Sequence, residues 1–218
     1  DKFIPAEKKG ELAALADLAA KDTIFFIADK EERAAYYAGQ LRTELGQKLD
    51  LLEKNAYRFC YVNDFPMFAL DPDTKQIGFT HNPFSMPQGG LEALMTKHPL
   101  DVLAYQYDIV CNGVELSSGA VRNHDMEIME KAFAIAGYDK ETLQHKFGAL
   151  YTAFQFGAPP HAGMAPGVDR MIMLLRGEEN IREVIAFPMS GSAQDLMCGA
   201  PNDVTEKQLR EVHIKIRS

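Results

Sequence analysis

The sequence predicts an α+β fold, in which an antiparallel sheet is flanked by helices and preceded by a small α/β lobe. Short apolar segments come in adjacent pairs separated by tight turns such as Asn112-Gly113, which is typical of antiparallel pairing. Segments with helical periodicity alternate with these strands. The pattern changes near residue 56, so we expect two parts, residues 1–56 and residues 57–218.

The first part is predicted to be a helix, a strand and a second helix. Apolar residues recur at three-to-four spacing over residues 7–20 and again over residues 31–45, and Gly46 is expected to end the second helix. Between them, residues 23–28 form an almost continuous apolar run bounded by charges, which predicts a buried strand. This part carries no catalytic constellation, so we interpret it as a packing or accessory module.

The second part begins after the polar stretch of residues 47–56 and holds most of the predicted elements. The predicted strands are residues 57–63, 76–80, 105–111, 114–116, 120–122 and 184–187. The predicted helices are residues 126–136, 141–154 and 168–175. Because paired strands follow each other along the chain, we expect an antiparallel sheet and not a doubly wound parallel one.

Composition excludes several classes of protein. The 218 residues are 46% hydrophobic and 25% charged, which excludes wholesale disorder. A net charge of −8 argues against a protein that coats nucleic acid by neutralising phosphates, although a local site for nucleic acid remains compatible with it. Three cysteines without a CxxC spacing argue against a disulfide framework and a zinc site. No apolar run is long enough for a membrane helix, so we expect a soluble, cytoplasmic protein.

Asp108 and Glu115 are candidate metal ligands. They lie in or beside successive predicted strands joined by the Asn112-Gly113 turn, so the chain folds them back towards each other. Two close carboxylates are unfavourable unless a cation or a donor lies between them. Mg²⁺ suits such a pair, because it takes one or two protein carboxylates and shares phosphate oxygens for the rest. An ordinary exposed hairpin is the alternative, and spacing alone does not decide.

Two arginines and a histidine complete the candidate site. Arg122 follows small residues in an apolar setting, where a guanidinium can grip a planar carboxylate, although an arginine paired with an internal carboxylate would look the same. Arg170 lies in the first turn of a predicted helix, where a cation is electrostatically unfavourable and hence of functional interest. His81 stands beside Asn82 in a loop that follows a predicted strand, where binding loops usually begin. Considered alone, the residue favours a structural role, because histidines are common in turns.

Taken in order, several segments of the second part resemble the C-terminal half of bacterial-type aspartyl-tRNA synthetases, which are class II aminoacyl-tRNA synthetases. Gly167-Val168-Asp169-Arg170 looks like the third signature motif of that class. Residues 1–56 look like the end of the insertion domain of the bacterial enzymes, and the resemblance covers residues 57–218 nearly continuously. The segments that carry it are residues 64–68, 80–83, 107–124, 157–170, 185–188, 194–197 and 199–201.

The resemblance implies an ATP-dependent ligase that joins L-aspartate to ATP as aspartyl-adenylate and passes the aspartyl group to tRNA. It also implies Mg²⁺ as cofactor and a homodimer as the full-length protein. In the family, the position of Arg122 grips the side-chain carboxylate of aspartate, and that of His81 lines the same pocket. The position of Glu115 binds ATP through Mg²⁺, with Asp108 beside it. The positions that contact ATP also include Gly167, Val168, Asp169 and Arg170, and the two catalytic positions are those of Arg122 and Arg170.

The sequence departs from the family pattern at several points. Asn82 stands where the family often has a second histidine, and Ser117-Ser118-Gly119 where it often has three glycines. The family's anticodon-binding barrel and its first two class II motifs have no match, so we expect a fragment that is inactive alone. The alternatives are an asparaginyl-type or amide-forming relative, or a non-catalytic binding module built on the same fold.

Overall fold

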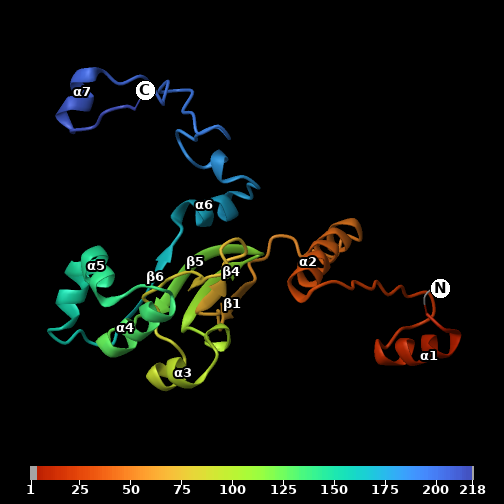
Figure 1. Ribbon diagram of the computed structural model, residues 1–218. Helices are drawn as coiled ribbons and strands as arrows, with labels where there is room; N and C mark the ends of the chain where they lie inside the picture. Colours follow the sequence, from red (N-terminus) through yellow and green to blue (C-terminus); the bar gives the residue numbers. More distant parts are fainter. Residues whose placement is uncertain (1–3, 218) are drawn as a thin grey trace. The chain divides into compact units, whose positions relative to one another are not determined.

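The computed structural model describes residues 4–217, and their helices and strands are labelled in Figure 1. The chain divides into two compact units, Asp1–Ala56 and Tyr57–Ser218, which are described separately. No helix among the described residues is long and apolar enough to cross a membrane.

The first unit holds two helices, α1 (Ala6–Leu15) and α2 (Glu31–Lys48). The prediction that Gly46 ends the second helix is wrong, since α2 runs two residues further. Asp50 takes the left-handed position after the helix, with φ of +52°, and the Leu51 N–H donates to the Gly46 carbonyl at 2.9 Å. This is the Schellman arrangement, with an aspartate where glycine is commonest.

The strand predicted over residues 23–28 is also wrong. Within the described residues this segment is irregular and pairs with no strand. A strand needs a neighbour with which to share backbone hydrogen bonds, and the described part of this unit contains no second strand. Phe25 and Phe26 consequently remain exposed.

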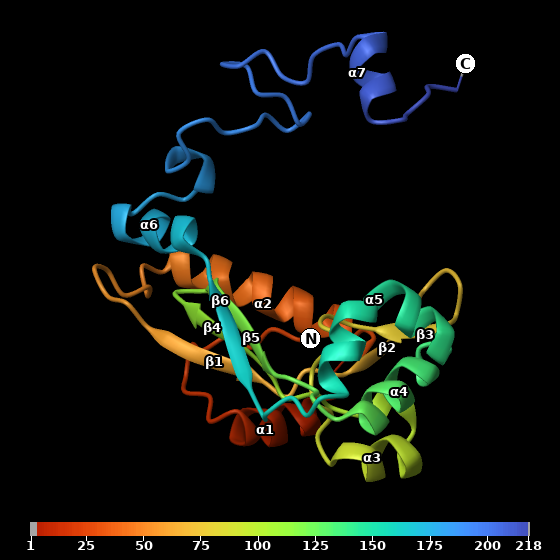
Figure 2. The same ribbon diagram turned by 90° about the vertical axis from the view of Figure 1, so that its left-hand side faces the viewer.

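The second unit is built on a four-stranded antiparallel sheet with the order β1-β4-β5-β6 (Figure 2). Its strands are β1 (Phe59–Asn63), β4 (Gln106–Cys111), β5 (Val114–Val121) and β6 (Ala162–Pro166). This confirms the predicted antiparallel α+β fold. Asn112 and Gly113 both have positive φ, as a two-residue hairpin turn requires. The two strands predicted over residues 114–122 form one continuous strand.

The core of this unit lies where three helices pack on a second, two-stranded sheet. The sheet pairs β2 (Phe68–Leu70) with β3 (Ile77–Phe79), and the helices are α3 (Gly90–Thr96), α4 (Met126–Ile135) and α5 (Lys140–Phe154). Phe68, Val102 and Ala132 are fully buried in one cluster, and Phe133 and Leu143 are buried in the next. Asp125 and Asp139 cap α4 and α5 by accepting hydrogen bonds from first-turn N–H groups.

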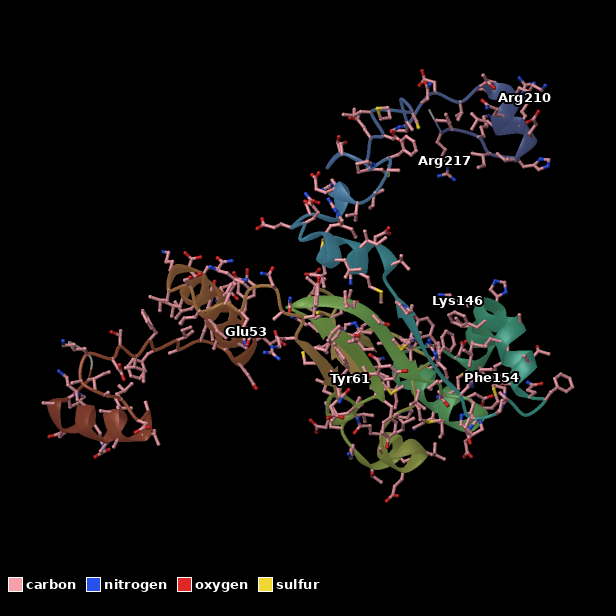
Figure 3. The ribbon with its side chains drawn as sticks, turned by 180° about the vertical axis from the view of Figure 1, so that it is seen from behind. Glu53, Tyr61, Lys146, Phe154, Arg210 and Arg217 are labelled. Atoms are coloured by element: carbon pink, nitrogen blue, oxygen red, sulfur yellow. The ribbon has the colours of Figure 1, made fainter. Side chains whose placement is uncertain are left out.

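Two more helices follow, α6 (Val168–Arg176) directly after β6 and α7 (Glu206–Glu211) near the C-terminus. The strand predicted over residues 184–187 is wrong. A short 3-10 helix, η2 (Ile181–Glu183), is followed there by irregular chain, and Phe187 is exposed because no strand edge lies alongside it. At the outer edge of the four-stranded sheet, Tyr61 of β1 also presents its ring to solvent (Figure 3).

Candidate functional site

One face of the four-stranded sheet gathers several of the predicted site residues. Residues paired across neighbouring strands point to the same side, and here Asp108 pairs with Ser118 and Gln106 with Ala120. Alternation along the chain places Arg122, immediately after β5, on this side as well. We call this side the site face.

The centre of the site face is lined by small residues. Across β5 and β6, Ser118 pairs with Ala165 and Ala120 pairs with Gly163. No side chain at these four positions is larger than a serine. In this floor of the site face, Ser118 and Ala165 are exposed, so another molecule can approach the backbone closely there, whereas Ala120 is buried.

A β-bulge brings Glu115 to the same face. The register between β4 and β5 shifts between Ile109 and Val110, so that Ser117 opposes Ile109 while Glu115 opposes Val110. Leu116 is thus an extra residue. Strict alternation from Ser118 would place Glu115 on the opposite face, and the extra residue reverses that. Asp108 and Glu115 therefore share one side of the hairpin, and a bulge of this kind has no sequence signal that would have revealed it.

Arg170 is held against Glu115, although 55 residues separate them along the chain. Its Nη1 donates to the main-chain carbonyl of Glu115 at 2.7 Å and lies 3.2 Å from the carboxylate Oε1. The Gly167 N–H donates to the Leu116 carbonyl at 2.7 Å, which fixes the start of α6 on β5. The carboxylate offsets the unfavourable position of a cation in the first turn of a helix. Both side chains remain nearly half exposed, so a ligand can reach them.

Arg122 lies at the other end of β5. Its backbone N–H donates to the His161 carbonyl at 2.9 Å, and it forms a bridge with Ser85 on the opposite side. The side chain is half-buried. Within residues 4–217, Arg122 forms no ion pair with a carboxylate, so the alternative of an internal structural pair is not observed. Its five donors are available to a ligand.

His81 is exposed in the loop next to Arg122. Its ring packs edge-on against Phe65, with ring centroids 5.3 Å apart. The neighbouring Asn82 closes a turn by accepting the Phe84 N–H on its Oδ1 at 2.9 Å. Gln106, which is not among the site residues predicted from the sequence, reaches this turn from β4 with its side-chain amide. The only sequence signal for it was a polar residue at the start of a buried strand.

The two carboxylates suit a cation that shares its ligands with a bound phosphate. Asp108 is half-buried and Glu115 is exposed. In the described part of the chain, no group of three or more His, Cys, Asp or Glu side chains is arranged to hold a metal by itself. Mg²⁺ needs fewer protein ligands, since it keeps waters and takes phosphate oxygens. Asp108 and Glu115 therefore fit Mg²⁺ that arrives with a nucleotide.

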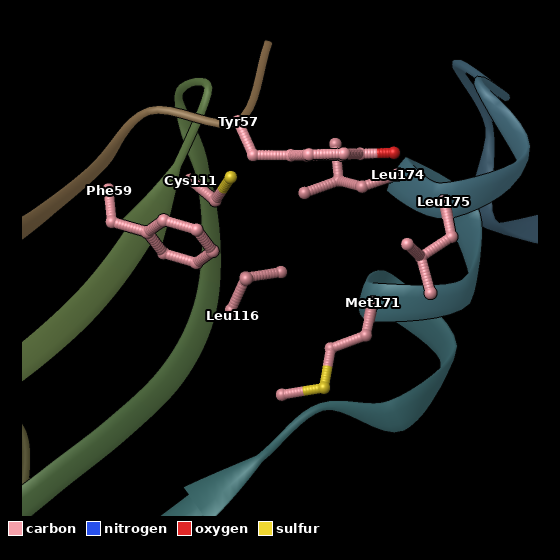
Figure 4. Close-up of a pocket in the computed structure, with 7 residues that line it drawn as sticks. All are labelled: Tyr57, Phe59, Cys111, Leu116, Met171, Leu174 and Leu175. Atoms are coloured by element: carbon pink, nitrogen blue, oxygen red, sulfur yellow. The ribbon is translucent and has the colours of Figure 1, made fainter. Parts of the chain in front are cut away.

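An apolar pocket lies between the β4–β5 hairpin and α6 and is distinct from the site face (Figure 4). Its volume is about 300 Å³, and Phe59, Leu116 and Leu174 are among the residues that line it. None of its lining side chains carries a charge, so it offers no means of recognising aspartate or a phosphate. The candidate site is therefore the site face.

Comparison with known proteins shows which family the chain resembles. The family described as class II tRNA synthetases (D, K and N) matches residues 10–191. The aspartate–tRNA(Asp/Asn) ligase of Zymomonas mobilis is 60% identical over 206 residues, which are 94% of this chain and 35% of that ligase. The aspartate–tRNA ligase of Streptomyces avermitilis is 55% identical over 216 residues, 99% of this chain and 37% of that ligase. The chain thus spans about a third of the length of these curated relatives.

A solved structure of an aspartyl-tRNA synthetase from Entamoeba histolytica also matches, with a TM-score of 0.48 and 24% identity. The match covers 87% of this chain and 32% of that structure.

Proposed function

The chain belongs to the class II tRNA synthetases (D, K and N), and we propose that the protein that contains it is an aspartate–tRNA ligase. In this proposal the α-carboxylate of L-aspartate attacks the α-phosphorus of ATP. This step forms aspartyl-adenylate and releases pyrophosphate. The aspartyl group then passes to tRNA. The observation that carries the proposal is the site face. There, Arg122, which has no ion pair within residues 4–217, lies with two carboxylates and a second arginine around small residues.

Arg122 is the proposed anchor for aspartate and one of the two proposed catalytic residues. Its guanidinium is half-buried and has no carboxylate partner among the described residues, which suits the side-chain carboxylate of the substrate. His81 would line the same pocket from the adjoining loop. Aspartate bound there would direct its α-carboxylate along the floor of the site face, towards the opposite end of β5.

Arg170 and Glu115 form the proposed ATP end of the site, together with Gly167, Val168 and Asp169 at the start of α6. The exposed guanidinium of Arg170, the second proposed catalytic residue, suits a nucleotide phosphate. Asp108 and Glu115 would hold Mg²⁺, which when bound offsets the charge of the phosphates. The protein's own contribution is then to hold the carboxylate and the α-phosphorus in line across the small-residue floor, since such positioning removes much of the barrier.

The remaining partners follow from the same proposal. The substrates are ATP, L-aspartate and tRNA, the full-length protein is a homodimer, and its location is the cytoplasm, where translation takes place. The Zymomonas relative is named for both tRNA(Asp) and tRNA(Asn), so a test of tRNA charging includes both.

The experiment that tests the proposal is pyrophosphate exchange into ATP by the full-length protein that contains this chain. We expect exchange that depends on aspartate and is much weaker with asparagine or lysine. Exchange that prefers asparagine would favour the asparaginyl-type alternative. A protein that binds ATP or aspartate but exchanges no pyrophosphate with any amino acid would favour the non-catalytic alternative.

A further inference from the structure

Gln106 places a buried amide at the start of β4, on the site face. Only 7% of its surface is exposed. Its Nε2 donates to the Ser85 hydroxyl at 2.7 Å and approaches the Asn82 carbonyl at 3.3 Å. A buried amide is costly unless it is hydrogen-bonded, and here both bonds lead to one turn. Gln106 therefore ties the turn of residues 82–85 to the sheet.

The turn is also held by backbone hydrogen bonds directly after it, where the Met86 N–H donates to the Val121 carbonyl at 2.8 Å and the Tyr105 N–H donates to the Met86 carbonyl at 2.9 Å. The turn is closed internally, because the Ser85 N–H donates to the Asn82 carbonyl at 3.2 Å and Asn82 Oδ1 accepts the Phe84 N–H. Ser85 is fully buried, so its hydroxyl has no access to water if the amide is lost. The Gln106 amide thus provides the side-chain link between this turn and the floor of the site.

The same turn lies against the end of β5 that carries Arg122. Ser85 and Arg122 form a β-bridge, and the Asn123 N–H donates to the Phe84 carbonyl at 2.7 Å. Gln106 in turn pairs with Ala120, two residues before Arg122. A shift of the turn would consequently move the backbone beside both His81 and Arg122.

We propose that Gln106 is a positioning residue that holds the turn of residues 82–85 beside Arg122 and thereby sets the affinity of the site for the amino acid. This inference rests on the proposed function. Glu115 and Arg170 lie at the other end of β5 and are joined by contacts that do not include Gln106. The effect of Gln106 is therefore confined to the aspartate end and leaves the ATP end unchanged.

The test is made on the full-length protein with Gln106→Met, which keeps the length of the side chain and removes its donor. We expect the KM for aspartate to rise about 5- to 20-fold, while the KM for ATP stays within about twofold. Gln144→Met, at an exposed position of α5, is the matched control and changes neither value. Ser85→Ala removes the same hydrogen bond from the other side, so the two effects should not add in the double variant.

Amide hydrogen exchange supplies a readout that does not depend on activity. Exchange at Phe84 and Ser85 should become faster in Gln106→Met and stay unchanged in Gln144→Met. An unchanged KM for aspartate, equal rises in both KM values, or additive effects with Ser85→Ala would overturn the inference. A parent protein that activates no aspartate would contradict the proposed function instead. In that case, faster amide exchange at Phe84 and Ser85 would still support the role of Gln106 in holding the turn. Unchanged exchange would overturn that role.

Discussion

The ring of Tyr107 lies directly across Gly119, where a Cβ atom would come within 2.5 Å of Tyr107 Cε2. The Tyr107 hydroxyl continues over β5 and donates to the Gly163 carbonyl of β6 at 3.1 Å. One side chain thus connects three strands, and it needs an atom-sized gap at Gly119. This explains why the third residue of the Ser117-Ser118-Gly119 segment is glycine.

Gly119→Ala is expected to destabilise the protein by about 1–3 kcal/mol, because the added methyl group collides with the Tyr107 ring and with the Gly163 carbonyl. Chemical denaturation of the parent and the variant measures the difference. Gly78→Ala is the matched control, since Gly78 also lies in a strand and has open space at its Cβ position. Equal stability of the two variants would mean that Tyr107 moves away at no cost.

Acid should weaken the packing of α4 against α5. The Tyr151 hydroxyl donates to Glu130 at 2.5 Å and Lys140 lies 2.9 Å from the same carboxylate, and these contacts lower the pKa of Glu130, the tyrosine most strongly. A carboxyl whose pKa is lower in the folded state stabilises the fold above its ordinary value of 4.5, and this contribution is lost as the pH falls through the folded pKa.

Tyr151→Phe should therefore lower the free energy of unfolding at pH 7 by about 1 kcal/mol and make stability less sensitive to pH below 4.5. Thermal unfolding followed between pH 3 and pH 7, as an approximate range around that pKa, measures both effects. Tyr138→Phe is the control, because the structure gives the Tyr138 ring a contact with Lys146 that does not use its hydroxyl. A Tyr151→Phe variant with the pH dependence of the parent would show that Glu130 does not depend on the tyrosine.

The hairpin and the antiparallel sheet could be predicted because their signal is local. Asn112-Gly113 is typical of a two-residue turn, and this turn pairs the strands on either side of it. Local signals failed where a segment depends on distant partners. Residues 23–28 have the composition of a strand but no neighbour in the described part of their unit, whereas β6 pairs with β5 despite a weak Ala-Gly-Met-Ala-Pro sequence.

In the candidate site, too, local patterns could be predicted from the sequence and contacts between distant segments could not. Asp108 and Glu115 could be selected from the hairpin, but the bulge that brings them to one face could not. The contact between Arg170 and Glu115 depends on how β6 and α6 return to β5, which no local pattern encodes. Gln106 could not be recognised at all without its partners, since its importance comes from two hydrogen bonds to a turn more than 20 residues earlier.

This 218-residue chain alone should not form aspartyl-adenylate at a useful rate. Arg122 and Arg170 serve the two ends of the proposed substrate complex, while Ser118, Ala120 and Ala165 between them carry no positive charge to stabilise the reacting phosphate. The loss of one group that donates a hydrogen bond to the charge of the transition state commonly costs about 3 kcal/mol. Pyrophosphate exchange compared between the chain and the full-length protein measures the loss. Equal rates would refute the expectation that this part is inactive alone.

Asp108→Asn and Glu115→Gln should each raise the Mg²⁺ concentration that half-activates the full-length protein. Each change removes one negative charge from the proposed metal–phosphate cluster and keeps the shape of the side chain. Titration of pyrophosphate exchange with Mg²⁺ measures the shift, and Asp73→Asn, an exposed position outside the site face, is the control. If both variants kept the Mg²⁺ dependence of the parent, the two residues would belong to an ordinary hairpin and the metal role would be wrong.

Arg122 should control the choice between aspartate and asparagine. The two amino acids differ by one oxygen and one amide nitrogen, so shape cannot separate them and charge must. A guanidinium offers only donors, which suit a carboxylate and leave an amide NH₂ facing another donor. Arg122→Lys replaces the planar fork by a point charge, and we expect it to cost about 2–4 kcal/mol in kcat/KM for aspartate. Arg122→Leu should lower kcat/KM for aspartate further and should reduce the difference in kcat/KM between aspartate and asparagine.

Activation kinetics of the full-length protein with both amino acids decide this prediction. Arg42→Leu, at an exposed position of α2, is the control for loss of a positive charge. It should leave kcat/KM for aspartate and for asparagine unchanged. Since Arg122 forms no internal ion pair in the described residues, its loss frees no buried carboxylate, and a drop in kcat/KM can be assigned to the substrate. If Arg122→Leu kept kcat/KM for aspartate within about threefold of the parent, a change of only ~0.7 kcal/mol, Arg122 would be a scaffold residue and aspartate would be recognised by other groups.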